Sequence, residues 1–218
     1  MNELLVKPEI ADIKRPESEG FKDIKPEGGM VVQDARAFVD GVFAEAGEDR
    51  RPLNEDTRAK LDEGGMSKVN IDKCTGDDAG KVYLKTINED KVGQTGENGV
   101  PYERKTIDVN GADIVGVFPQ FDSKCDVQLP DDLYKASDAK QADACNQKLQ
   151  EDVDNDPELA KQFTNEQREQ IRNGETPDGY TWHHNEEPGK MQLVKTEDHQ
   201  KNSHTGGKSI WGGGKENR

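Results

Sequence analysis

Alternation of apolar and polar residues is most regular in the second half of the chain, where it predicts paired strands. Two alternating segments, 102–109 and 112–118, flank Asn110-Gly111. An Asn-Gly dipeptide readily adopts the two positive φ angles of a two-residue hairpin turn. A β-hairpin is therefore expected here. Further strands are expected within 121–129 and at 81–87, the latter inside a glycine-rich stretch, 64–99, that otherwise favours loop.

Helical spacing of apolar residues, together with residues typical of helix starts and ends, predicts helices elsewhere. In segment 32–46 this spacing places Phe38, Val39 and Val42 on one face. Further helices are expected at 54–63, at 132–151, from Pro157, and from Thr164 to a stop at Asn173-Gly174.

The first 30 residues favour an extended linker. They repeat a basic residue, a proline and an acid in Lys7-Pro8-Glu9, Arg15-Pro16-Glu17 and Lys25-Pro26-Glu27. Proline removes a backbone donor, and charged neighbours have little apolar surface to bury. The sequence thus predicts a flexible proline-rich linker at 1–30, a helical or loop region at 31–98 and a domain at 99–218. The linker also predicts a larger delivery protein or secretion adaptor upstream.

Composition limits the size of the core and the choice of partner. Only 30% of the 218 residues are hydrophobic, and the mean hydropathy is -1.04, which disfavours a single core filling the whole chain. A net charge of -15 normally argues against a nucleic-acid partner. Residues 180–218, however, hold six Lys or Arg against five Asp or Glu, a balance of +1, so residues 1–179 carry -16. The acidity belongs to the body of the chain, and its C-terminal part is close to neutral.

Cysteine usage and hydropathy exclude two further classes of protein. Cys74, Cys125 and Cys145 are odd in number and none sits in a CxxC pair, so a fold without disulfides is expected. No apolar run approaches the roughly 20 residues that span a bilayer, and the N-terminus lacks a signal-peptide pattern.

All four histidines of the chain, His183, His184, His199 and His204, fall within 22 residues. Imidazole both ligates transition metals and exchanges protons near neutral pH, so the cluster indicates a metal site, a general base, or both. Strand-forming residues precede the His-His pair, a Pro-Gly turn follows, and Thr196 is a natural N-cap for a helix that contains His199. The expected order is hairpin, then helix.

These residues carry a resemblance to the WHH branch of the HNH/endonuclease VII nuclease superfamily, which commonly forms the C-terminal domain of bacterial polymorphic toxins. It covers about 99–214 and rests on these motifs: Pro101-Tyr-Glu-Arg-Lys105, Phe118-Pro-Gln-Phe-Asp-Ser-Lys124, Trp182-His183-His184, Gln192-Leu193-Val194, Asp198-His199 and His204-Thr205-Gly206-Gly207. The resemblance implies an α+β fold with a ββα-metal nuclease core, an added β-hairpin and helices, and an N-terminal part that is irregular or helical.

The resemblance also implies the chemistry, which is hydrolysis of phosphodiester bonds, with DNA favoured over RNA. His183, His199 and His204 would hold a divalent ion (Zn, Mg, Mn or Ni), and His184 would be the general base. This division of roles requires the strand to end at the His-His pair, because neighbouring strand residues point to opposite faces.

Two departures from the HNH pattern leave alternatives open. The asparagine that HNH enzymes place between the histidines is missing, and Gln192 or Asn185 is the nearest candidate. His199 and His204 are five apart, about 140° around an ideal helix, so both ligate only if the helix breaks; otherwise Asp198 or Glu197 would replace His204. Arg104 would contact a phosphate, or else it is an exposed hairpin charge.

Two classes of function follow from this reading. The first is a nuclease toxin that acts in the cytoplasm of a target bacterium and is held by a cognate immunity protein in the producer. The second is a non-enzymatic, zinc-stabilised interaction module, and an RNA-cleaving toxin of the same fold is a variant of the first. The substrate face is expected at five lysines: Lys190, Lys195, Lys201, Lys208 and Lys215. An acidic inhibitor would be attracted there and repelled by the acidic body.

Overall fold

The computed structural model describes residues 50–217, which belong to one compact unit, Glu48–Arg218. The expected linker at 1–30 and the expected helix at 32–46 lie outside these residues. The elements, in chain order, are β1 (Arg51–Pro52), α2 (Glu55–Glu63), α3 (Lys68–Ile71), β2 (Cys74–Gly76), β3 (Val82–Leu84), η1 (Glu89–Lys91), η2 (Glu97–Gly99), β4 (Tyr102–Val109), β5 (Ala112–Pro119), β6 (Ser123–Gln128), η3 (Asp131–Leu133), α4 (Asp138–Asn155), α5 (Pro157–Ala160), α6 (Asn165–Arg172), β7 (Tyr180–His184), β8 (Lys190–Lys195), α7 (Thr196–Lys201), α8 (Lys208–Trp211) and η4 (Gly214–Asn217).

The larger sheet is built on the expected β-hairpin. Strands β4 and β5 pair antiparallel from Tyr102 opposite Pro119 to Val109 opposite Ala112. The turn between the two strands consists of Asn110, with a φ of 53°, and Gly111, with a φ of 77°. The hairpin prediction is therefore confirmed. The full strand order is β1-β2-β3-β5-β4, and β3 pairs parallel with β5. This sheet consequently joins residues on both sides of position 99.

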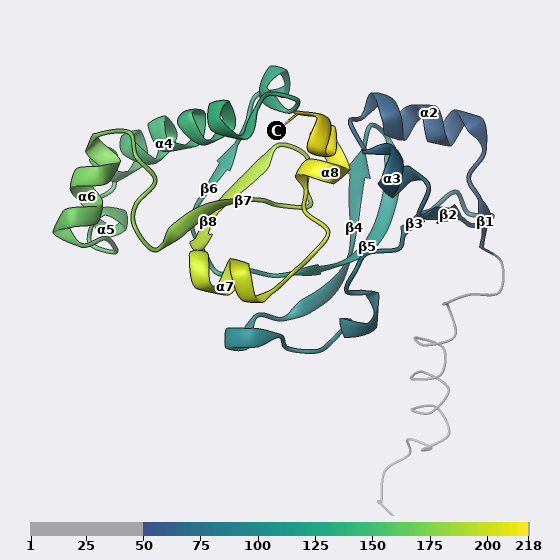
Figure 1. Cartoon of the computed structure of the whole chain (residues 1–218), viewed down its shortest axis with the longest axis horizontal. Coiled ribbons are helices and arrows are strands. Elements are labelled where there is room, and N and C mark those ends of the chain that lie inside the picture. The colour runs from purple at the N-terminus through teal and green to yellow at the C-terminus, as the bar shows by residue number, and fades with distance from the viewer. Residues whose placement is uncertain (1–49, 218) are drawn as a thin grey trace, which may run out of the picture. The chain divides into compact units, whose positions relative to one another are not determined.

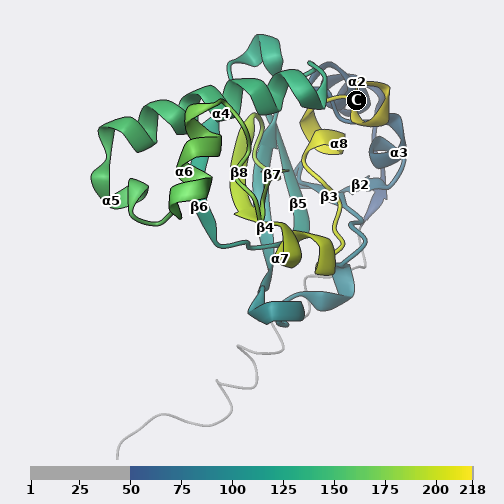
Figure 2. The same cartoon turned by 60° about the vertical axis from the view of Figure 1, so that its left-hand side comes forward.

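A smaller sheet carries the histidine-rich segment. Its strand order is β6-β8-β7, with β7 and β8 paired antiparallel from Tyr180 opposite Lys195 to His184 opposite Met191. Helix α7 follows β8 directly and lies close to both strands in the two views of the fold (Figures 1 and 2). The chain therefore forms the strand–turn–strand–helix order that the sequence predicts.

Of the three helices between β6 and β7, the first begins later than expected. A helix from 132 was predicted, but Asp131–Leu133 is a single 3-10 turn and α4 begins at Asp138. The side chain of Ser137 accepts a hydrogen bond from the backbone of Lys140 at 3.4 Å, so the N-cap serine and not the upstream proline sets the start. Helices α5 and α6 begin at the expected caps, Asp156 and Thr164. In Figure 2, α4 crosses one side of the smaller sheet and α5 and α6 follow at its end.

A mixed α+β architecture with one main core emerges from these elements. The core gathers residues from the large sheet, the small sheet, α4 and α8, including Ile114, Leu149, Leu193 and Trp211, each without exposed surface. The three cysteines are buried free thiols. Within the described part of the chain, no helix is long and apolar enough to cross a membrane.

Candidate metal centre and active site

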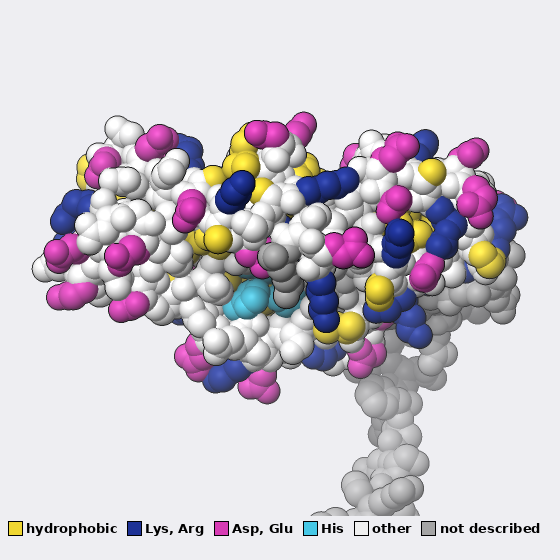
Figure 3. Space-filling view, turned by 45° about the horizontal axis from the view of Figure 1, so that its top comes forward, with side chains coloured by type: hydrophobic (Ala, Val, Ile, Leu, Met, Phe, Trp, Pro, Cys, Tyr) yellow, Lys and Arg dark blue, Asp and Glu magenta, His cyan; other side chains and the backbone are white. Residues whose placement is uncertain are grey.

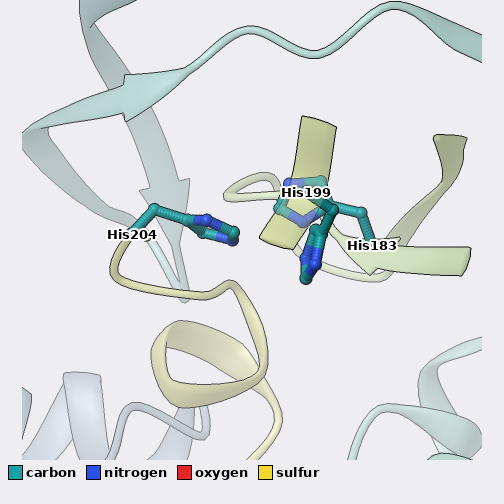
Figure 4. A group of neighbouring side chains, drawn as sticks. All are labelled: His183, His199 and His204. Atoms are coloured by element: carbon teal, nitrogen blue, oxygen red, sulfur yellow. The ribbon is translucent and has the colours of Figure 1, made fainter. Parts of the chain in front are cut away.

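Three histidines from three local structures meet at one point. His183 is near the end of β7, His199 is in α7, and His204 is in the loop after α7. One ring nitrogen from each lies within 4.8 Å of the other two, and Figure 4 shows the rings turned toward a common centre. The structure therefore brings together the three residues that the sequence predicts as metal ligands.

The end of α7 explains how His199 and His204 face each other despite their spacing of five. The helix ends at Lys201, and Asn202 has φ of -113° and ψ of 76°, so the chain leaves the helical path before His204. The predicted break is confirmed. The predicted N-cap is wrong, because Lys195 holds that position and Thr196 is the first helical residue, with no side-chain cap.

Hydrogen bonds from the segment 87–97 hold the loop that carries His204. Asn88 donates from its side chain to the carbonyl oxygen of Ser203 at 2.6 Å, and the backbone amide of Ile87 donates to the hydroxyl of Thr205 at 3.2 Å. Asn202 is 2% exposed and donates to the carbonyl oxygen of Glu97 at 3.1 Å. The glycine-rich stretch expected to be loop thus supports the site.

Phe121 forms the apolar wall of the site. Its ring centroid lies 4.9 Å from that of His183, 5.6 Å from that of His199 and 5.5 Å from that of His204. With Val100 and Val194 it makes a small second core. Sequence reasoning missed this residue, although it sits inside the quoted Phe118–Lys124 motif, because a lone aromatic between strands has no periodicity to mark it.

Burial keeps the three imidazoles neutral. The pKa of His183 is lowered well below its usual value by burial, and then by His204, His199 and His184. Burial and the neighbouring His204 lower the pKa of His199 to about 4. The pKa of His204 is lowered by burial, against the opposing effects of its backbone hydrogen bond to Asn202 and of Glu186. Neutral imidazole is the form that binds a metal ion.

The donor set fits a divalent ion with three protein ligands. Nε2 of His183 is buried without a hydrogen-bond partner among the described residues. Nδ1 of His204 donates to the carbonyl oxygen of Asn202 at 2.8 Å, which leaves Nε2 as its ligand atom. The alternative ligands are engaged elsewhere, because Asp198 accepts from Asn98 at 2.7 Å and Glu197 accepts from Lys201 at 2.6 Å.

An open side makes this a place where chemistry can occur. A pocket of about 380 Å³ is lined by all four histidines and by Trp182, Gln200, Ser203, Gly206 and Lys208. Figure 3 shows the imidazoles in a hollow of the surface. Three protein ligands beside open space are typical of catalytic metal sites, whereas structural zinc sites are closed by four.

His184 stands next to the ligand group but makes different contacts. Strand β7 ends at His184, as the division of roles requires, and Nε2 of His184 lies 2.8 Å from the amide oxygen of Gln141 in α4. The ring centroid of Trp211 is 5.7 Å from that of His184. His184 is therefore held beside the pocket by residues outside the histidine cluster.

The two candidates for the missing asparagine bind each other. The Asn185 side chain donates to Oε1 of Gln192 at 2.9 Å, and Gln192 donates to Asp126 at 3.2 Å. Gln192 is the cross-strand partner of His183. Both residues therefore brace the turn between β7 and β8, and neither lines the pocket.

Arg104 lies away from the pocket, whereas Lys208 lines it. Arg104 is exposed on β4 and does not line the pocket. The next residue of the strand, Lys105, forms an ion pair with the buried Glu186, with 2.6 Å between Nζ and Oε1. Because adjacent strand residues point to opposite faces, Arg104 points away from this ion pair. Lys208, expected on the substrate face, lines the pocket of the histidines, although only 2% of its side chain is exposed.

Comparison with known proteins indicates a family for part of the chain. No curated protein and no solved structure matches the chain. Residues 110–206 match the family model described as the DNase/tRNase domain of colicin-like bacteriocin. All four histidines lie within the matched residues. The match supports a nuclease toxin domain in this part of the chain.

Proposed function

We propose that the chain is a metal-dependent HNH-type endonuclease toxin of the WHH branch, which hydrolyses phosphodiester bonds and favours DNA. The observation that carries the proposal is the convergence of three neutral imidazoles on one point beside a pocket that a fourth histidine also lines. The family match to a DNase/tRNase domain supports the same chemistry.

His183, His199 and His204 would hold the ion, which when bound polarises a phosphate oxygen and stabilises the charge that develops on it. His184 accepts a proton from the attacking water at a ring nitrogen. Phe121 excludes water from the back of the ligand group, and the Asn202 carbonyl keeps His204 in the tautomer whose Nε2 is free. The chain thereby supplies three fixed ligands and a separate base.

The family match supports the biological setting that we propose. Toxins of this kind act inside a target bacterium, so the producer requires an immunity protein that binds the folded domain, and a delivery protein or secretion adaptor carries the toxin out. The interaction-module alternative predicts a protein that binds zinc and cleaves nothing.

Cleavage assays separate the alternatives. The protein should nick supercoiled plasmid in the presence of Mg²⁺, Mn²⁺, Ni²⁺ or Zn²⁺ and lose this activity in EDTA. Parallel reactions on tRNA and on single-stranded RNA test the preference for DNA. Tight zinc binding without cleavage of any substrate would favour the interaction module and end the nuclease proposal.

A further inference from the structure

Two exposed lysines, Lys73 and Lys85, form a small positive patch at one end of β2 and β3. These strands pair antiparallel with Cys74 opposite Leu84. One position further along, the backbone amide of Lys85 donates to the carbonyl oxygen of Lys73 at 3.3 Å, and both lysines are exposed. Residues directly opposite each other in an antiparallel pair have Cβ atoms about 5 Å apart and share a face. We call these two residues the lysine patch.

No acidic side chain offsets the charge of the lysine patch within the described residues 50–217, because neither lysine forms an ion pair there. Asp72, the acid next to Lys73 in the sequence, is paired with Arg58 instead. Like charges at directly opposite positions of a sheet are destabilising. A negatively charged partner would relieve this repulsion, so the lysine patch favours an anion.

The chain leads from the lysine patch to the pocket of the four histidines. Two residues after Lys85, the backbone amide of Ile87 donates to the hydroxyl of Thr205 at 3.2 Å, and two residues span at most about 7 Å. Thr205 lies between His204 and Gly206, which both line the pocket. The side chain of Ile87 is 55% exposed, so the surface between the patch and the pocket is open at this point. In Figure 3, Lys or Arg side chains and hydrophobic side chains lie on one side of the imidazoles.

Two of the lysines expected on the substrate face have carboxylates beside them. Lys201 lies 2.6 Å from Glu197, and Lys190 lies 3.5 Å from both Asp126 and Glu187. A carboxylate at this distance lowers the attraction that the ammonium group exerts on a phosphate. The lysine patch keeps its full charge, although it lies upstream of the residues that match the family model.

We propose that the lysine patch binds the phosphate backbone of the DNA substrate and holds the strand whose scissile phosphate enters the histidine pocket. This inference rests on the proposed function, because it concerns the substrate of the same site. Ammonium groups bind phosphates as point charges and do not read bases, so the contact is independent of sequence. Each phosphate that a lysine neutralises releases counterions, which makes the contact visible in the salt dependence of binding.

DNA binding at increasing salt concentrations tests the lysine patch. The full chain with His184→Ala, loaded with zinc, allows binding to a fluorescein-labelled DNA duplex to be followed by anisotropy without cleavage. In this background, Lys73→Gln/Lys85→Gln should reduce the slope of log affinity against log salt by about 2, because each phosphate-binding lysine contributes about 1. Lys73→Arg/Lys85→Arg retains both charges and should keep the slope.

Lys60 and Lys81 provide a matched control. Both are exposed and line one pocket at the other end of β3. Lys60→Gln/Lys81→Gln removes the same charge and should leave the slope unchanged. An equal reduction in both double variants would show that net charge, and not the lysine patch, determines binding. An unchanged slope in Lys73→Gln/Lys85→Gln, or no binding of the duplex at all, would also overturn the inference.

Cleavage by the protein with His184 intact separates this inference from the proposed function. If that protein cleaves no nucleic acid but the lysine patch sets the salt slope, the nuclease proposal fails and the DNA-binding surface stands. If it cleaves DNA, Lys73→Gln/Lys85→Gln should raise KM and leave kcat unchanged, because the contact is made equally in the ground state and the transition state. Cleavage with an unchanged KM and an unchanged slope would leave the nuclease proposal standing and show that the lysine patch does not bind the substrate.

Discussion

The side-chain amide of Asn88 donates to the carbonyl oxygen of Ser203 at 2.6 Å, across 115 positions of the chain. Asn88 is 2% exposed, and Ser203 directly precedes His204 in the sequence. A residue well upstream of the histidine cluster thus fixes the backbone that presents the third ligand.

Asn88→Ala should therefore weaken metal binding without unfolding the protein. Loss of an outer partner of a metal ligand typically lowers affinity about 10- to 100-fold. Zinc affinity measured against a competing chelator should drop by this order. Asn155→Ala, which removes an exposed side-chain bond to Glu151 within α4, is the control and should leave affinity unchanged. Equal affinities in the two variants would show that the hydrogen bond of Asn88 does not support the site.

Substitutions in the histidine cluster should separate ligand from base. His184→Ala should abolish plasmid cleavage and leave metal content and the unfolding transition nearly intact. His199→Ala should lose both bound metal and activity, because His199 supplies one of the converging nitrogens. Metal content by atomic absorption and nicking rates measure the two effects. Wild-type cleavage by the His184→Ala variant would refute the assignment of His184 as the general base.

Acidification should destabilise the metal-free protein. The folded-state pKa of His199 is lowered by burial to about 4, whereas an unfolded histidine has a pKa of about 6.5. Between these values the unfolded chain binds more protons, so this contribution to stability is present above about pH 6.5 and is lost as the pH falls toward 4. Urea unfolding of EDTA-treated protein should show a steeper loss of unfolding free energy in this window than the His199→Gln variant. The difference in slope should be at most about 1.4 kcal/mol per pH unit. Parallel pH curves would contradict the lowered pKa.

An acidic immunity protein should dock beside the pocket. Of the lysines expected on this face, Lys195 is exposed, whereas Lys201 and Lys190 lie near acidic side chains at 2.6 and 3.5 Å. Attraction to this face should make association slow as ionic strength rises. Lys190→Glu/Lys201→Glu should lower the association rate and flatten its salt dependence in stopped-flow measurements. Unchanged kinetics would rule out these lysines, and a basic inhibitor on the acidic body would reverse the picture.

Sequence periodicity and turn chemistry were enough to predict the parts of the fold with strong local signals. The Asn110-Gly111 hairpin and the caps at Asp156 and Thr164 appear in the structure. In each case a few neighbouring residues set the local geometry, so the sequence alone contains the information.

The remaining features depend on contacts between distant segments. Strands β1 and β2 have two and three residues, too few for alternation to be visible. Strand β2 forms because β3 offers an edge, and β1 then pairs with β2. Lys208 carries a charge that favours exposure, yet Gln141 and Ala136 supply acceptors that allow its burial. Contacts of this kind cannot be predicted from the local sequence, because each one depends on where a distant segment lies in the fold.

The position of β5 inside the larger sheet, between β3 and β4, has a consequence for dissecting the protein. The family match begins at residue 110, after β4 has ended. A fragment cut there would leave both edges of β5 without partners and would expose unpaired backbone groups, which invite aggregation. It would also lose Asn88, which holds the loop before His204. The stretch that matches the family model is thus shorter than the piece that must fold, and a folded fragment has to reach back at least to Val82, where β3 begins.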